Sequence, residues 1–392
     1  MLRTKRTNLS AASLLLGLAC TTICTTGNAG PREQAKRIHD RLAGTPPSAT
    51  VLTSMAAKVA AGDALGAAMD AMANPAFYNT TVRELATPWT NRDRSVYADL
   101  NDSTATVIGM VRDDVPFDQL LFGDIVYVGS TAATPVTYSH TDNNHYVELQ
   151  SNHVDLGNPA NLVRQTQSSL PGTPLGAGQT AGIMTTRGFS SAFLVAGTNR
   201  APVRFAALNS MCMDMEDFRD VTAWPDRIRQ DVSRSPGGDS NLFLNDCLAC
   251  HAGLDGLAGA FSFYDFDATA GRTVYTPNTV QPKVVKAAGT FAFGFETSGD
   301  SWINYWRTGP NAFVGWRGSG SGSGAKSLGM ELAQTRQFST CQVRNVFEKV
   351  CYRAPNGAAD LQAVETIANS FEANNRSLKR VFAETAVYCM GN

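Results

Sequence analysis

Apolar residues recur at helical spacing in the first third of the chain. In residues 31–44 they fall on one face of a helix, and Gly44 follows as a stop signal. Ser48 is placed to cap a second helix, and residues 95–111 and 116–123 repeat the helical pattern. These spacings predict a series of short helices.

A second helical pattern lies at the end of the chain. It predicts helices over residues 341–353, 359–375 and 377–389. The apolar stripe of the first of these helices consists of Val343, Val346, Phe347 and Val350. The Gly- and Ser-rich residues 317–329 predict a flexible connector that leads into a helix beginning near Lys326.

The middle of the chain has a different residue pattern and composition. Residues 124–157 mix strand-like alternation with Thr, Asn and Gly, and residues 168–182 have the composition of a loop. Helical spacing resumes over residues 199–218. We therefore expect a mainly α-helical protein, with helical N- and C-terminal modules and a middle segment of loops and strands.

These changes divide the chain into five stretches, and no internal repeat is found. The expected stretches are a signal segment (1–29), an N-terminal helical module (30–123), an irregular middle module with strands (124–210), a segment that holds a cysteine and histidine motif (211–310) and a C-terminal helical module (311–392).

Composition and charge are those of an ordinary globular protein. Of the 392 residues, 43% are hydrophobic, and 33 basic residues face 34 acidic ones, so the formal net charge is -1. Such a balance argues against nucleic acids and acidic membrane surfaces as partners. The sequence also lacks the motifs of nucleotide binding, phosphoryl transfer, serine hydrolysis and zinc proteases.

The N-terminus has the three-part pattern of a secretory signal. Basic residues precede an apolar run over residues 9–24, and small polar residues follow, so we expect cleavage after Ala29. The run is too short for a membrane anchor, and no later stretch is long and apolar enough to span a bilayer. Cleavage before Cys20, to give a lipoprotein, is an alternative that Gly17 disfavours. The expected location is the periplasm, the cell surface or the extracellular space.

Export changes the expected use of the cysteines, because an oxidising compartment disfavours free thiols. Two of the eight cysteines lie in the signal segment. If two of the other six serve a cofactor, the remaining four allow three pairings. Of these we favour Cys212 with Cys341 and Cys351 with Cys389, which would fasten the middle of the chain and the last helix to the C-terminal region.

The motif that carries chemistry is Cys-x-x-Cys-His, formed by Cys247, Cys250 and His251. This spacing is the pattern for covalent attachment of a c-type haem. The two thiols add to the two vinyl groups at one edge of the porphyrin, and the histidine binds iron as the proximal ligand. The motif occurs once, so one covalently attached haem is expected. Gly253, Gly256 and Gly259 would let a flat cofactor approach the backbone.

Three rival interpretations stand beside haem attachment. A thiol-redox pair would need a βαβ context, whereas this neighbourhood is glycine-rich and helical. A structural zinc site would need a second pair of ligands at zinc-finger spacing, and none recurs. A plain disulfide between Cys247 and Cys250 is seldom structural.

The sequence alone does not decide which residue binds the iron on its distal side. Methionine in that position raises the reduction potential, histidine lowers it, and an open position makes a reaction site. The candidates are Met330, which follows the Gly-rich connector, and His145, beside Asn144 and Tyr146. Another methionine, from the group Met211, Met213 and Met215, or no ligand at all, is the remaining alternative.

Several stretches resemble the large planctomycete-type cytochrome c proteins, whose modules are known only as uncharacterised domains. The matching stretches are "IHDRLAGTPPS", "ANPAFYNTTVRELATPW" and "VRDDVPFDQLLFGDIVYVG" in the N-terminal module, "NNHYVEL" and "TAGIMTTRGFSSAFLVAGTNRAPVRFAALN" in the middle, "CLACHAGLDGLAGAFSFYDFD" at the motif and "QFSTCQVRNVFEKVCYR" near the end. The resemblance implies a cytochrome c-like haem domain, with Cys247 and Cys250 attaching haem, His251 as proximal ligand and His145 as a candidate of note.

The chain departs from this family at one position. Leu254 stands where the family commonly has a methionine, so the distal ligand cannot come from this position. The family has no established reaction. We expect an exported single-haem electron carrier that works between redox protein partners. The alternatives are a haem-dependent oxidase or peroxidase with an open distal site, and a structural or binding module at the cell surface.

Overall fold

The computed structural model describes residues 29–285 and 290–391, so the expected signal segment and its cleavage lie almost wholly outside the described residues. Within them the chain forms fourteen α-helices and six short strands. The expected mainly α-helical fold is thereby confirmed. No helix in this part of the chain has the length and apolar character needed to cross a membrane.

The first helices end and begin at the residues that the sequence indicates. Gly44 closes the first helix in a left-handed conformation with φ 67°, which glycine adopts without strain. The Ser48 side chain accepts a hydrogen bond from the backbone N–H of Val51 and caps the second helix. The helices of this module are α1 (Pro31–Ala43), α2 (Ala49–Ala60) and α3 (Ala64–Ala71).

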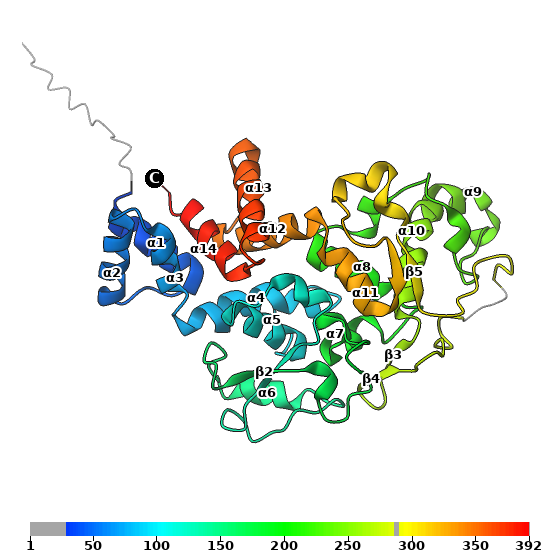
Figure 1. The fold of residues 1–392 in the computed structure, drawn as a ribbon, viewed down its shortest axis with the longest axis horizontal. Coiled ribbons are helices and arrows are strands. Elements are labelled where there is room, and N and C mark those ends of the chain that lie inside the picture. The colour runs from blue at the N-terminus through cyan, green and yellow to red at the C-terminus, as the bar shows by residue number, and fades with distance from the viewer. Residues whose placement is uncertain (1–28, 286–289, 392) are drawn as a thin grey trace, which may run out of the picture.

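The C-terminal helices pack on one another and on the N-terminal module (Figure 1). They are α12 (Arg336–Cys351), α13 (Gly357–Ala373) and α14 (Leu378–Tyr388). Helix α14 contacts α1 and α3, and the Gln34 side chain donates to the carbonyl oxygen of Gly391 over 2.9 Å. The two ends of the described chain therefore lie side by side.

A buried central helix, α5 (Asp102–Arg112), joins the modules. Its residues from Asp102 to Val111 are all buried. It begins seven residues later than the start of the expected helix at residue 95, because Asn101 caps it by accepting from the N–H of Thr104. It contacts α4 (Arg83–Ala86), α7 (Arg187–Phe193) and the antiparallel hairpin β1–β2 (Val126–Gly129, Leu162–Gln165). Helix α6 (Asn144–Ser151) packs on β1, and a second antiparallel hairpin, β3–β4 (Tyr264–Asp267, Arg272–Tyr275), packs on α7.

Helix α8 (Ala201–Met211) is shorter than the helix expected over residues 199–218. It ends at Cys212, whose φ of 53° is left-handed, and a disulfide fastens this residue to Cys341 on α12, with the two Cα atoms 5.4 Å apart. The expected pairing of these cysteines, and that of Cys351 with Cys389, are both present.

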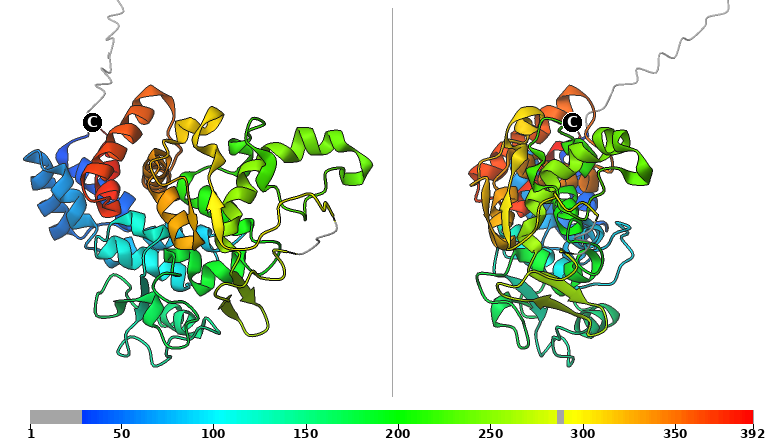
Figure 2. Two further views of the ribbon diagram at one scale, coloured as in Figure 1. Left: turned by 45° about the vertical axis from the view of Figure 1, so that its right-hand side comes forward. Right: turned by 90° about the vertical axis from the view of Figure 1, so that its right-hand side faces the viewer.

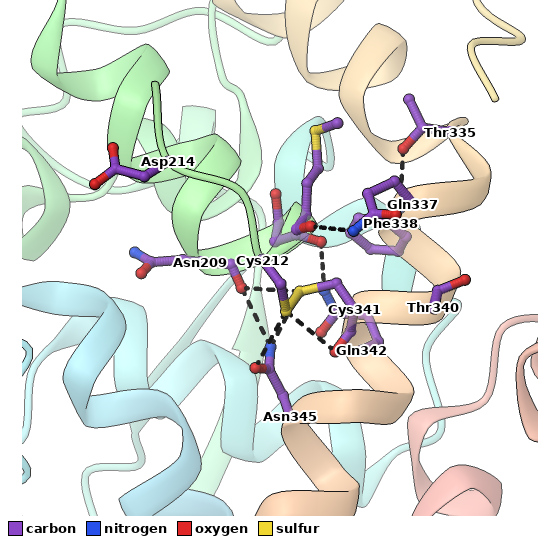
Figure 3. The surroundings of a disulfide bond; sticks show 12 residues. Asn209, Cys212, Asp214, Thr335, Gln337, Phe338, Thr340, Cys341, Gln342 and Asn345 are labelled. Atoms are coloured by element: carbon purple, nitrogen blue, oxygen red, sulfur yellow. Dashed lines mark hydrogen bonds between the residues drawn. A yellow bond between two sulfur atoms is a disulfide. The ribbon is translucent and has the colours of Figure 1, made fainter. Parts of the chain in front are cut away.

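Side chains of α12 complete the end of α8 (Figure 3). A helix leaves its last carbonyl groups without partners inside the helix. Here amide groups of α12 donate to them: Gln337 to Met211, Gln342 to Ser210 and Asn345 to Asn209, over 2.8, 3.0 and 3.3 Å. The disulfide and these hydrogen bonds fix α8 against the C-terminal module.

The Gly- and Ser-rich stretch 317–329 is not simply a flexible connector. Its residues Ser321–Ser323 form strand β6, which pairs antiparallel with β5 (Ser301–Ile303). Helix α11 (Gly324–Ala333) follows directly and starts two residues before the expected position. The backbone hydrogen bonds of the pair order a stretch that composition alone assigns to flexible chain.

One hydrophobic core includes residues from every module. A single cluster of buried side chains contains Ile38 and Leu42 of α1, Tyr127 of β1, Phe347 of α12, and Trp306, which follows β5. The sequence modules therefore share a continuous core.

Candidate functional site

The cysteine and histidine motif lies on one continuous helical run. It consists of α9 (Ser240–Leu242), a wider π-helical turn (Phe243–Cys247) and α10 (Leu248–Ala258). Cys247 stands at the junction between the π-turn and α10. Figure 2 shows this run extending at one end of the molecule. Residues three and four apart share a helix face, so Cys247, Cys250 and His251 point toward one side.

Both thiols of the motif are unpaired and half-buried. The other described cysteines are in disulfides, so the fold leaves only this pair reduced. The Cys250 Sγ lies 3.5 Å from the carbonyl oxygen of Met215, to which the thiol donates. Burial raises the pKa of the Cys250 thiol.

The His251 ring is fixed through one of its two nitrogens. Its Nδ1 lies 3.0 Å from Oδ1 of Asp255, one helical turn further along α10. An ionised carboxylate only accepts hydrogen bonds, so Nδ1 carries a proton, and in the neutral imidazole the lone pair is on Nε2. The ring is about one-quarter exposed. His251 is thus arranged to offer Nε2 to a metal.

The Asp255 carboxylate is wholly buried and bonded at both oxygens. Arg200, just before α8, donates from Nε to Oδ1 over 2.6 Å and from Nη2 to Oδ2 over 2.8 Å. The backbone N–H of Arg229 donates to Oδ2 over 2.9 Å. Burial opposes ionisation, but the hydrogen bonds from Arg200 and His251 outweigh it and hold the pKa of Asp255 well below its usual range.

Asp231 completes this charged network on the far side of Arg200. It accepts from Nη1 and Nη2 of Arg200 over 2.8 and 2.7 Å. The Arg229 side chain is also buried, and its Nη2 donates to the carbonyl oxygen of Thr198 over 2.6 Å. Burial and the neighbouring Arg200 lower the pKa of Arg229 to about 10. Two arginines and two aspartates therefore balance one another behind His251.

The glycines of α10 have a different role from the one expected. A Cβ atom on Gly253 would lie 2.1 Å from the indole of Trp306, and one on Gly259 would lie 2.2 Å from the carbonyl oxygen of Ser301. A Cβ atom on Gly256 would lie 2.8 Å from the carbonyl oxygen of Ile303. The glycine face of α10 is thus covered by β5 and the residues after it, and the interpretation that these glycines admit a flat cofactor is wrong.

Apolar side chains stand exposed on the segments that flank the motif. Trp224 is 74% exposed and Val221 68% exposed, on a loop that a hydrogen bond from the N–H of Asp220 to the carbonyl oxygen of Ala249 ties to α10. Leu244, in the π-turn, is half-exposed. Exposed apolar side chains that form a contiguous patch often mark a contact with a partner or a ligand.

The two distal candidates lie elsewhere in the fold. His145 is buried in α6, where its Nδ1 donates to the carbonyl oxygen of Val136 over 2.6 Å and its Nε2 accepts from the N–H of Gly129 over 2.8 Å. Both ring nitrogens are therefore engaged by the chain, and α6 lies well away from α10 in Figure 1. Met330 is 37% exposed on α11. The methionine beside the motif is Met215, one of the alternative candidates.

Sequence reasoning missed Asp255, Arg200 and Asp231. A signal for the first was present, because an aspartate four residues after a histidine on a helix can reach its ring. The arginine is 55 residues away from Asp255 along the chain and gave no local signal.

Comparison with known proteins adds no family to this description. No protein-family model, curated protein or solved structure matches the chain.

Proposed function

We propose that this chain is an exported c-type cytochrome that carries one haem and passes single electrons between redox proteins of the periplasm or cell surface. The observation that supports it is the arrangement on α10. Two unpaired thiols lie one helical turn apart, beside a histidine whose Nδ1 is fixed and whose Nε2 is free. This donor set is the one that covalent haem attachment requires.

The residues of the motif fit the chemistry of attachment. Each thiol, of Cys247 and of Cys250, would add its sulfur and its hydrogen across one vinyl double bond, so no oxidant is needed. His251 would hold iron through Nε2 and keep its proton on Nδ1, facing Asp255. When bound, haem supplies an iron that gains and loses one electron. The exposed apolar side chains of Trp224, Val221 and Leu244 suit a largely apolar cofactor.

The test is production of the full chain together with the cytochrome c maturation machinery. We expect a red protein with a c-type pyridine haemochrome spectrum, and one haem mass on the tryptic peptide that contains His251. The double variant Cys247→Ser/Cys250→Ser should fold and lose the covalent mass. A colourless wild-type protein, or a peptide in which Cys247 and Cys250 form a disulfide, would overturn the proposal and favour a structural module.

A second candidate function is a haem oxidoreductase with an open distal position. The observation that favours it is the placement of the two distal candidates, because His145 is engaged through both nitrogens and Met330 faces solvent on another helix. It predicts a high-spin ferric spectrum and rapid cyanide binding. A low-spin spectrum with a methionine-to-iron charge-transfer band would contradict it.

A further inference from the structure

The His251 imidazole is held by a carboxylate rather than by a backbone carbonyl group. We propose that Asp255 is a positioning residue that orients this imidazole and strengthens it as an electron donor to iron, which sets the haem to a low reduction potential. This inference rests on the proposed haem function and goes beyond it, because it says in which direction the chain biases the redox equilibrium.

The first argument is that hydrogen bonds occupy every acceptor position of the Asp255 carboxylate. An ionised carboxylate has about four acceptor positions. In Asp255 all four are used: Oδ1 accepts from His251 and from Nε of Arg200, and Oδ2 accepts from Nη2 of Arg200 and from the N–H of Arg229. The carboxylate cannot rotate without breaking several of these bonds, so it holds the histidine ring in one orientation.

The second argument is the charge that this carboxylate brings to the ring. A carboxylate that accepts from the Nδ1 proton of a ligating histidine raises the basicity of the ligand. A more basic ligand stabilises the ferric form relative to the ferrous form, and so lowers the potential. The interaction is strong because Asp255 is buried, where water does not screen it.

The third argument is that the supporting residues come from three separate segments. Arg200 precedes α8, Arg229 lies in the loop before α9, and Asp255 is on α10. Asp231 holds Arg200 from its other side through two hydrogen bonds. Residues outside α10 therefore fix the position of Asp255. An ion pair between two residues of one surface helix would not hold it in this way.

The experiment compares Asp255→Asn with Asp231→Asn in the haem-loaded full chain. Asparagine keeps the size of the side chain and removes its charge, and residue 231 serves as the matched control because it contacts Arg200 but not His251. We expect both proteins to carry covalent haem. We expect Asp255→Asn to shift the reduction equilibrium at least tenfold toward the ferrous form, about 59 mV for one electron, and Asp231→Asn to shift it much less.

Several results would overturn the inference. An unchanged potential in Asp255→Asn would do so, as would an equal shift in Asp231→Asn, which would indicate a general effect of charge. A wild-type protein without haem would instead refute the proposed function itself. If Asp255→Asn fails to fold, nitrogen-15 NMR of histidine-labelled wild-type protein decides, because the inference requires a slowly exchanging proton on Nδ1 of His251 and a rapidly exchanging one contradicts it.

Discussion

The indole of Trp306 packs directly against the backbone of Gly253, two residues beyond His251. A Cβ atom on Gly253 would lie 2.1 Å from Cε2 and from Nε1 of this indole. Trp306 is itself fully buried and stacks on Phe218, with ring centroids 4.4 Å apart. The contact therefore holds α10 in place directly after the motif.

We therefore expect Gly253→Ala to destabilise the protein, because the added methyl group has no room beside Trp306. Forcing a methyl group into a packed core typically costs about 1–3 kcal/mol. The measurement is urea unfolding followed by circular dichroism. Gly178→Ala is the matched control, since a Cβ atom there meets nothing within 4 Å. Equal stability of the two variants would show that the contact is not tight.

The two disulfides should contribute unequally to stability. The bridge between Cys212 and Cys341 spans 129 residues, and that between Cys351 and Cys389 spans 38. A longer closed loop restricts the unfolded chain more, and the chain-entropy relation gives about 5 and about 4 kcal/mol. We expect the double alanine variant of the first pair to lose more free energy of unfolding. The reverse order, measured by urea unfolding, would contradict this explanation.

Stability should fall as the pH is lowered from 7.5 to 5.5, in part because of two histidines, one half-buried and one buried. Burial lowers the pKa of His140 below the ordinary value of 6.5. The folded state therefore resists protonation of this ring. The stability that the neutral ring contributes is complete above the pKa of the unfolded state and is lost as the pH falls through the pKa of the folded state. Burial also lowers the pKa of His145, against the hydrogen bond with Val136. Urea unfolding of His140→Gln should show a shallower pH dependence than wild type, and an identical slope would refute the role of His140.

His145→Gln should weaken the fold and leave the haem spectrum unchanged. The histidine joins Gly129 of β1 to Val136 through two partly buried hydrogen bonds, and an unsatisfied buried group costs about 1–3 kcal/mol. Met330→Leu is the control, and it should change neither stability nor spectrum because Met330 is partly exposed. Loss of a low-spin, six-coordinate spectrum in either variant would identify that residue as the distal ligand.

Local signals in the sequence predicted much of the helical framework. Gly44 and Ser48 mark helix ends because their preferences depend on the backbone of the nearest turn alone. The apolar stripe of α12 is likewise buried as expected, at Val343, Val346, Phe347 and Val350. These elements depend on neighbours within a few residues, which is the range that periodicity reports.

Features that depend on distant partners were not predictable in this way. Helix α8 stops at Cys212, where a disulfide and side chains of α12 hold the last turn, although its helical spacing continues beyond it. Strand β6 is ordered by pairing with β5, although its composition is that of a linker. Asp255 and Asp231 form ion pairs with Arg200, which is 55 and 31 positions away from them along the chain. No local sequence pattern near either aspartate indicates this arginine.

The side-by-side placement of the two chain ends has a consequence for orientation. Gln34 and Arg37 of α1 bind the carbonyl oxygens of Gly391 and Met390, so both ends leave the molecule near α1. Helices α9 and α10 lie at the other end of the long axis in Figure 1. A protein tethered to a surface through either terminus would therefore project α10 outward, as the part that arriving molecules meet first.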